Sequence, residues 1–153
     1  MHSPASLQPI ALSASRLKFI VDNIPDTEIR PSAIHGHGLF TTRPFQAGEL
    51  LATLDGQVIN WQSYDQIRST LPYGDDNNDL FMEWNALSPD TLLIRPFRTK
   101  YSFINHGRNA NIQRIDAPLR LVTTMAIPAQ TELLIDYRNE PLSADYLQQA
   151  SFL

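Results

Sequence analysis

The chain has 153 residues, of which 42% are hydrophobic and 18% are charged, as expected for one globular domain with its own core. It contains no cysteine, which excludes disulfides, thiolate metal sites and a cysteine nucleophile. The net charge of −4 argues against bulk nucleic-acid binding and is compatible with a basic protein partner. There is no apolar run of the roughly 20 residues that cross a membrane and no signal peptide, so we expect a cytoplasmic protein.

The first part of the chain predicts short extended segments. Residues 1–17 are rich in Ser, Ala and Pro and predict a flexible N-terminal arm. Aliphatic and β-branched residues then predict extended structure at 17–22, 28–29, 39–40 and 49–59. Asp55-Gly56 inside the last segment is a hairpin signal.

The clearest helical pattern covers residues 60–71. Trp61 and Tyr64 fall on one face at helical spacing, and Asn60 is a suitable N-cap. We interpret the two aromatic side chains as core contacts. The acidic loop at 74–79 lacks the glycine and glutamate positions of a calcium-binding loop, so we interpret it as a solvated loop.

The second half of the chain predicts more strands and one short helix. The strands are expected at 80–84, 91–95, 101–104, 112–115, 119–126 and 132–137. Ser143 is a suitable cap for a last helix through Gln149. Many short strands with one clear helix predict a mainly β, small α+β domain.

Three short sequences stand out from this β pattern. G-H-G-L-F at 36–40 has two glycines, which let the backbone approach a ligand or take unusual conformations. The second sequence is F-I-N-H-G-R-N-A-N at 103–111, which begins with two apolar residues and continues with seven residues that have no large apolar side chain. Such a transition is typical of loops that carry function. E-L-L-I-D-Y at 132–137 ends a predicted strand in an acid and a phenol. Each alone is short enough to be a tight turn or a strand end.

In this order and at these separations, the three sequences resemble the motifs of the SET domain, the fold of most protein-lysine methyltransferases. The resemblance covers roughly residues 28 to 137. It implies a β-clip-like fold of small curved sheets, in which the segment ending at Tyr137 threads in a knot-like way through the Asn105-His106 region. We accordingly expect a SET domain at 18–141 with a variable insert at about 60–90. Its compact form looks more like a bacterial or viral member than a eukaryotic chromatin enzyme.

The resemblance also implies an activity, the transfer of a methyl group from S-adenosylmethionine to a lysine of a basic protein. Such an in-line displacement requires mainly positioning and a neutral amine. Desolvation in an aromatic channel depresses the amine's pKa, which is about 10.4 in water. Tyr137 is implied as the central catalytic tyrosine, with a half-buried tyrosine at a strand end as the alternative. Tyr101 and Phe103 are channel candidates for which a core role is equally compatible with the sequence.

The methyl donor is implied to lie against two of the three motifs. These donor-binding residues are Gly36, His37, Gly38, Leu39, Asn105 and His106. His106 is implied to form a structural hydrogen bond and not to act as a general base. A metal site at the histidines is an unlikely alternative, because the acids lack ligand spacing. Arg30 or Arg43 pairs with the donor's carboxylate or belongs to the solvated surface.

Several positions depart from the family pattern. Gly107-Arg108 stand where Ser-Cys is usual, Ala110 replaces a proline, and Ile135 occupies the position where an aromatic residue influences the number of methyl groups added. The absence of cysteine also removes the family's zinc segment, so the tail at 142–153, through Phe152, or a second subunit of a homodimer must close the channel. These departures leave open a catalytically inert SET-like protein-binding module, which donor binding would distinguish from an enzyme.

Overall fold

The computed structural model describes residues 19–70 and 83–149, which form two compact units. One unit contains residues 19–54 and 99–137, and the other contains residues 55–70, 83–98 and 138–149. No helix among these described residues is long and apolar enough to span a membrane.

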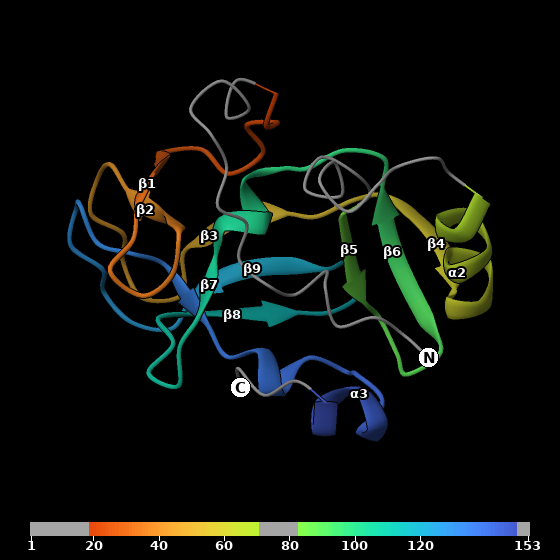
Figure 1. Cartoon of the computed structure of the whole chain (residues 1–153). Helices are drawn as coiled ribbons and strands as arrows, with labels where there is room; N and C mark the ends of the chain where they lie inside the picture. The colour runs from red at the N-terminus through yellow and green to blue at the C-terminus, as the bar shows by residue number, and fades with distance from the viewer. Residues whose placement is uncertain (1–18, 71–82, 150–153) are drawn as a thin grey trace. The chain divides into compact units, whose positions relative to one another are not determined.

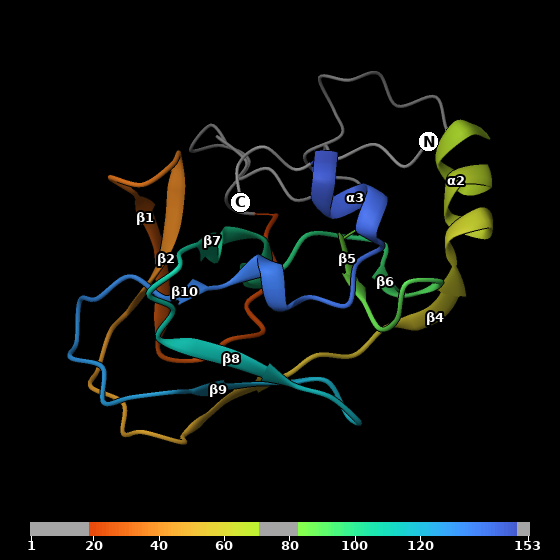
Figure 2. The ribbon, with the colours of Figure 1, turned by 90° about the horizontal axis from the view of Figure 1, so that it is seen from below.

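The first unit consists of three small sheets (Figures 1 and 2). They are the antiparallel hairpin of β1 (Thr27–Pro31) and β2 (His37–Thr41), the antiparallel sheet of β3 (Leu50–Thr53), β9 (Arg120–Thr123) and β8 (Ile112–Ile115), and the parallel pair of β7 (Asn105–His106) and β10 (Leu134–Ile135). Aliphatic side chains from all three sheets contribute to the core, among them Leu39, Leu121 and Ile135, which are 0%, 0% and 3% exposed. The mainly β architecture expected from the sequence is confirmed.

The second unit is built on an antiparallel sheet with the strand order β4-β6-β5 (Figure 1). Its elements are β4 (Gln57–Asn60), α2 (Trp61–Thr70), β5 (Glu83–Ala86), β6 (Thr91–Arg95) and α3 (Ala144–Gln149). The helix begins as predicted, because Asn60 Oδ1 accepts a hydrogen bond of 2.8 Å from the Ser63 amide. Trp61 packs edge-to-face against Tyr64 and Trp84, with ring centroids 5.7 and 5.0 Å apart, which confirms both predicted core aromatics.

A buried ion pair lies within this second sheet. Arg95 Nε donates to Glu83 Oε2 at 2.6 Å, and both side chains are at most 4% exposed. The guanidinium also donates to the Asp55 carbonyl at 2.8 Å and to the Asn85 side chain. Glu83 lies on β5 and Arg95 on β6, so the ion pair joins the two strands. Removing one partner would leave a buried charge without its counter-ion, which is strongly destabilising.

The predicted hairpin over 49–59 is wrong. Strand β3 pairs with β9, and β4 pairs with β6. Gly56 has a φ of +152°, and a Cβ at this position would lie 2.3 Å from the Ile94 carbonyl oxygen. The glycine therefore serves a close approach of β6 and not a two-residue turn.

The predicted strand at 101–104 is also wrong. Residues Lys100–Phe103 form the 3₁₀ helix η3, and the Thr99 side chain caps it by accepting from the Tyr101 amide. Both aromatic residues of this turn are buried, so their spacing fits a short helical turn as well as a strand. Similarly, the strand predicted at 132–137 is reduced to β10, and Tyr137 begins the 3₁₀ helix η4 (Tyr137–Asn139).

Candidate functional site

The parallel pair β7–β10 brings the second and third sequence motifs side by side (Figure 2). Each strand has only two residues, and Asn111 extends the pairing beyond them. Asn111 Nδ2 donates to the Glu132 carbonyl at 2.9 Å, and Asn111 Oδ1 accepts from the Leu134 amide at 2.8 Å. A side-chain amide thus takes the place of a strand's own peptide group.

His106 fastens the segment that follows β10. Its Nδ1 accepts a hydrogen bond of 3.1 Å from the Tyr137 backbone amide, which assigns the proton of a neutral imidazole to Nε2. Asp136 Oδ1 lies 3.8 Å from the same nitrogen, too far for a hydrogen bond. With Nδ1 engaged in this way, the imidazole ring holds the backbone of Tyr137 in place.

The described residues contain no group of three or more His, Cys, Asp or Glu side chains that could hold a metal ion.

Tyr137 lies within the same arrangement. The residue is 5% exposed, and its hydroxyl donates a hydrogen bond to the Ile104 carbonyl. The His106 and Tyr137 rings are 5.6 Å apart at an angle of 31°. A phenol that donates its proton to a carbonyl keeps an oxygen that can accept a further hydrogen bond.

Asn105 connects β7 to the glycine loop before β2. The residue is 1% exposed, and its Nδ2 donates to Glu132 Oε1 at 2.8 Å. The same nitrogen lies 3.2 Å from the His35 carbonyl, 3.3 Å from the His37 carbonyl and 3.3 Å from Ser32 Oγ. Two buried atoms here, Asn105 Oδ1 and His37 Nδ1, have no hydrogen-bond partner among the described residues. Unpaired buried polar atoms are uncommon in proteins and mark places where a ligand could supply the partner.

The glycine loop has a tighter geometry than its sequence indicates. Gly36 has a φ of +46°, in the left-handed region that glycine favours. A Cβ on Gly38 would lie 2.1 Å from Glu132 Oε1, so the space at Gly38 accommodates that carboxylate and is not open to a ligand. Leu39 is 0% exposed, and its side chain belongs to the core.

Three of the predicted channel residues are described, and they lie in the unit that contains Tyr137. Tyr101, Phe103 and Ile135 are 7%, 1% and 3% exposed, and Phe103 is among the largest fully buried side chains. Phe152 and the acidic loop at 74–79 lie outside the described residues.

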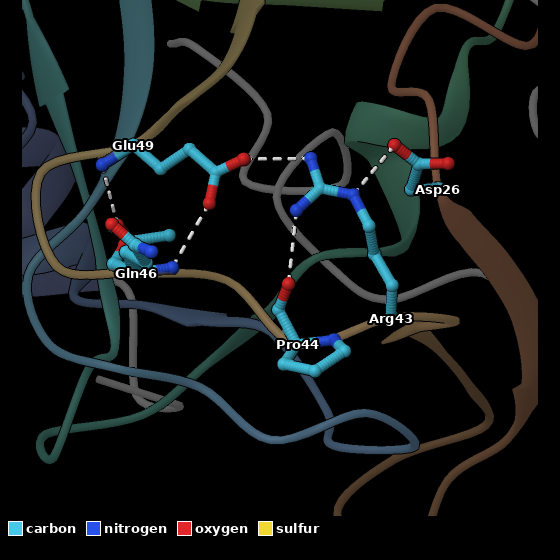
Figure 3. Close-up of polar contacts among 6 residues, drawn as sticks. Asp26, Arg43, Pro44, Gln46 and Glu49 are labelled. Atoms are coloured by element: carbon cyan, nitrogen blue, oxygen red, sulfur yellow. Dashed lines mark hydrogen bonds and ion pairs between the residues drawn. The ribbon is translucent and has the colours of Figure 1, made fainter.

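The two candidate arginines are engaged in ion pairs. Arg43 Nε donates a hydrogen bond of 2.9 Å to Asp26, and Arg43 Nη2 donates one of 2.6 Å to Glu49 (Figure 3). Arg43 Nη1 donates to the Pro44 carbonyl. Arg30 lies 3.3 Å from Glu28. Both arginines are therefore engaged with carboxylates of this chain.

Glu49 stabilises the turn after β2 by accepting hydrogen bonds from Arg43 and from the Gln46 amide. Its second oxygen accepts from the Gln46 amide at 2.9 Å (Figure 3). The hydrogen bond from Arg43 and then that from the Gln46 amide hold the pKa of Glu49 below its usual value, and the hydrogen bonds to Glu49 and Asp26 raise the pKa of Arg43. The turn between β2 and β3 is thus held by ion pairs at an exposed surface.

Sequence reasoning missed two residues of the site, Ser32 and Glu132. The Ser32 hydroxyl donates to both oxygens of Glu132, at 2.8 and 3.0 Å. Glu132 opens the third motif, which is the signal that could have marked it, whereas nothing in the local sequence distinguishes Ser32.

Comparison with known proteins agrees with this geometry. A family model described as SET domain matches residues 36–138, more than half of the chain, and the match includes all three motifs. No curated protein shows a significant match to the chain.

Proposed function

The chain belongs to the SET-domain family, whose members are in general protein-lysine methyltransferases, and on that premise we propose that it transfers a methyl group from S-adenosylmethionine to a lysine of a basic protein. The observation that carries the proposal is the buried Asn105 amide, which joins the glycine loop to β7 and keeps one oxygen without a partner.

The residues of the site fit the methyl donor. S-adenosylmethionine has an ammonium group that donates hydrogen bonds and a purine with donors and acceptors. Asn105 Oδ1 is a buried acceptor, and leaving such an atom unpaired costs about 1–3 kcal/mol. His37 Nδ1 is a second unpartnered buried atom at the same loop. We assign both atoms to donor binding, together with the backbone of Gly36. When bound, the donor supplies a methyl group activated by a sulfonium.

Tyr137 is the residue that we assign to the lysine amine. Its hydroxyl proton is donated to the Ile104 carbonyl, so its oxygen can accept a hydrogen bond from the amine and orient the nitrogen lone pair. The burial of the ring provides an apolar surrounding that lowers the pKa of an amine held there. The tyrosine thus orients the amine and needs no proton transfer of its own.

The substrate class follows from charge. The chain has 16 acidic against 12 basic residues, which favours association with a basic, lysine-rich protein segment. We therefore assign a basic protein as the acceptor.

Calorimetric titration with S-adenosylmethionine tests the donor site. We expect the unsubstituted protein to bind, Asn105→Ala to lose binding, and Asn109→Ala, a change of the same kind at an exposed position of the same segment, to bind normally. Absence of binding to the unsubstituted protein would favour the inert protein-binding module.

Transfer is tested with a radiolabelled donor and lysine-rich basic peptides. We expect Tyr137→Phe to bind the donor as before and to lose most of the transfer, because the oxygen that orients the amine is gone. Transfer at the unsubstituted rate by Tyr137→Phe would refute the role of Tyr137.

A further inference from the structure

Glu132 has no role in the function proposed above, yet it lies at the centre of the site's hydrogen bonds. Both oxygens of its carboxylate accept a hydrogen bond from the Ser32 hydroxyl, at 2.8 and 3.0 Å. One of them, Oε1, also accepts a hydrogen bond of 2.8 Å from Asn105 Nδ2. It occupies the space that a side chain on Gly38 would fill. The carboxylate therefore contacts residues from β7 and from both sides of the glycine loop.

The hydrogen bonds around Asn105 decide which end of its amide faces a ligand. The two ends of an asparagine amide are nearly identical in shape, but one donates and the other accepts. Asn105 Nδ2 faces four oxygen atoms, which belong to Glu132, Ser32, and the backbone carbonyls of His35 and His37. The Ser32 hydroxyl has donated its proton to Glu132 and acts as an acceptor toward Asn105. Rotating the amide by 180° would place Oδ1 against these four acceptors, so the oxygen is directed away from them.

We propose that Glu132 is a positioning residue, which fixes the Asn105 amide so that Oδ1 presents an acceptor to the donor's ammonium group. This inference rests on the proposed function, because it explains how the same pocket recognises a ligand with an N–H group. Glu132 thus acts through Asn105. Its removal weakens the preference for an ammonium, while contacts to the rest of the ligand remain.

Gly38 provides an independent means of displacing the carboxylate. A Cβ at Gly38 would lie 2.1 Å from Glu132 Oε1 and 2.7 Å from its Cδ, and Gly38 is not among the residues with positive φ. Gly38→Ala is therefore acceptable to the backbone but pushes the carboxylate away from Asn105. In a Glu132→Ala background the added methyl group meets no carboxylate, so the two substitutions should not be additive.

The experiment is calorimetric titration with two ligands, S-adenosylmethionine and an analogue that lacks the α-amino group. Removing a partner from a hydrogen-bonded polar group typically weakens binding by about 10- to 100-fold. We expect this loss for S-adenosylmethionine with Glu132→Ala and with Gly38→Ala, and less than about threefold for the analogue. Glu132→Gln keeps an oxygen that can accept from Asn105 and should bind within about threefold of the unsubstituted protein. Glu28→Ala, which removes a carboxylate elsewhere in the same unit, is the matched control.

The outcomes separate the inference from the proposed function. Equal weakening of both ligands by Glu132→Ala would indicate general damage to the pocket and would overturn the inference, as would unchanged affinity or additive effects of Gly38→Ala and Glu132→Ala.

If the unsubstituted protein binds no donor, the proposed function fails, and NMR of the Asn105 side-chain NH₂ group still decides the orientation. Slow hydrogen exchange of this group that is lost in Glu132→Ala supports the inference. Slow exchange that persists in this variant overturns it.

Discussion

Asn111→Ala removes the side chain that extends the β7–β10 pairing, and we expect it to destabilise the protein markedly. Asn111 is 9% exposed, and its amide group forms one hydrogen bond to the Glu132 carbonyl and one to the Leu134 amide. The alanine methyl group can replace neither bond, and both backbone groups lose their partner.

The magnitude follows from these two bonds. Each has a net value of about 0.5–1.5 kcal/mol, and each stranded backbone group adds a desolvation penalty of about 1–3 kcal/mol where water cannot reach it. Glu132 and Leu134 are only partly buried, so water recovers part of that penalty. We expect a loss of about 2–3 kcal/mol, which corresponds to a fall in Tm of about 4–12 °C for a chain of this length.

The assay is urea unfolding followed by two probes. Far-UV circular dichroism reports on the whole chain, whereas both tryptophans, Trp61 and Trp84, lie in the unit that does not contain Asn111. The midpoint from circular dichroism should shift to lower urea. A parallel shift in fluorescence would show that the two units unfold together, and an unchanged fluorescence midpoint would show that they unfold independently.

Asn109→Ala is the matched control, because it removes the same side chain at an exposed position two residues earlier. Such a surface change usually alters stability by no more than about 0.5 kcal/mol. If Asn111→Ala and Asn109→Ala have the same circular dichroism midpoint, the side chain does not substitute for a strand and the reasoning fails.

Three further predictions rest on other contacts. The pKa of Glu49 is held below its usual value of 4.5, so its stabilising contribution is complete above about pH 4.5 and is lost as the pH falls through the lower, folded-state value; Glu49→Gln should lower the urea midpoint at pH 7, the difference from the unsubstituted protein should shrink as the pH is lowered below 4.5, and a difference that does not change with pH would contradict this. Gly107→Ser should destabilise by about 1–3 kcal/mol through overpacking, because a Cβ at 107 would lie 2.9 Å from Leu134 Cδ1; the penalty, measured by thermal unfolding, should shrink in a Leu134→Val background. Glu83→Ala should cost about 3–5 kcal/mol by tryptophan fluorescence, since it leaves the buried Arg95 charge without its carboxylate; a loss below about 1 kcal/mol would show that the charge finds water.

Local signals predicted the elements that depend on local interactions. The helix α2 and its cap at Asn60 followed from a polar residue before apolar residues at helical spacing. The strands β5 and β6 fall within or beside the predicted runs. The three motifs identified the family because their order along the chain is far more specific than any one of them.

Strand partners could not be predicted in the same way. Asp55-Gly56 has the composition of a hairpin turn, but Gly56 is required by the approach of the Ile94 carbonyl, which comes from almost forty residues later in the chain. The side chains of Tyr101 and Phe103 can be buried by a strand or by a 3₁₀ turn, so their spacing does not distinguish the two. The Thr99 side chain, which accepts a hydrogen bond from the Tyr101 amide, favours the turn.

The candidate site shows the same division. Asn105 and Tyr137 were assigned through the motifs that contain them. The contact between Ser32 and Glu132 joins residues 100 positions apart, and no local pattern announces it. The glycines at 36 and 38 predict a close approach of the backbone to a ligand, but a sequence shows only that a side chain is missing and not that the Glu132 carboxylate fills the space at Gly38.

The parallel pair β7–β10 also bears on the order in which the protein folds. Its strands lie about 30 residues apart in the chain, so pairing them requires closing a long loop, with only two residues on each strand to compensate. The hairpins β1–β2 and β8–β9 join neighbouring segments and can form first. A chain at that stage has these local hairpins but lacks the contacts that hold His106 against Tyr137. The donor binding proposed above should therefore arise after the hairpins in refolding, so that it reports a later stage of folding than the circular dichroism of the hairpins.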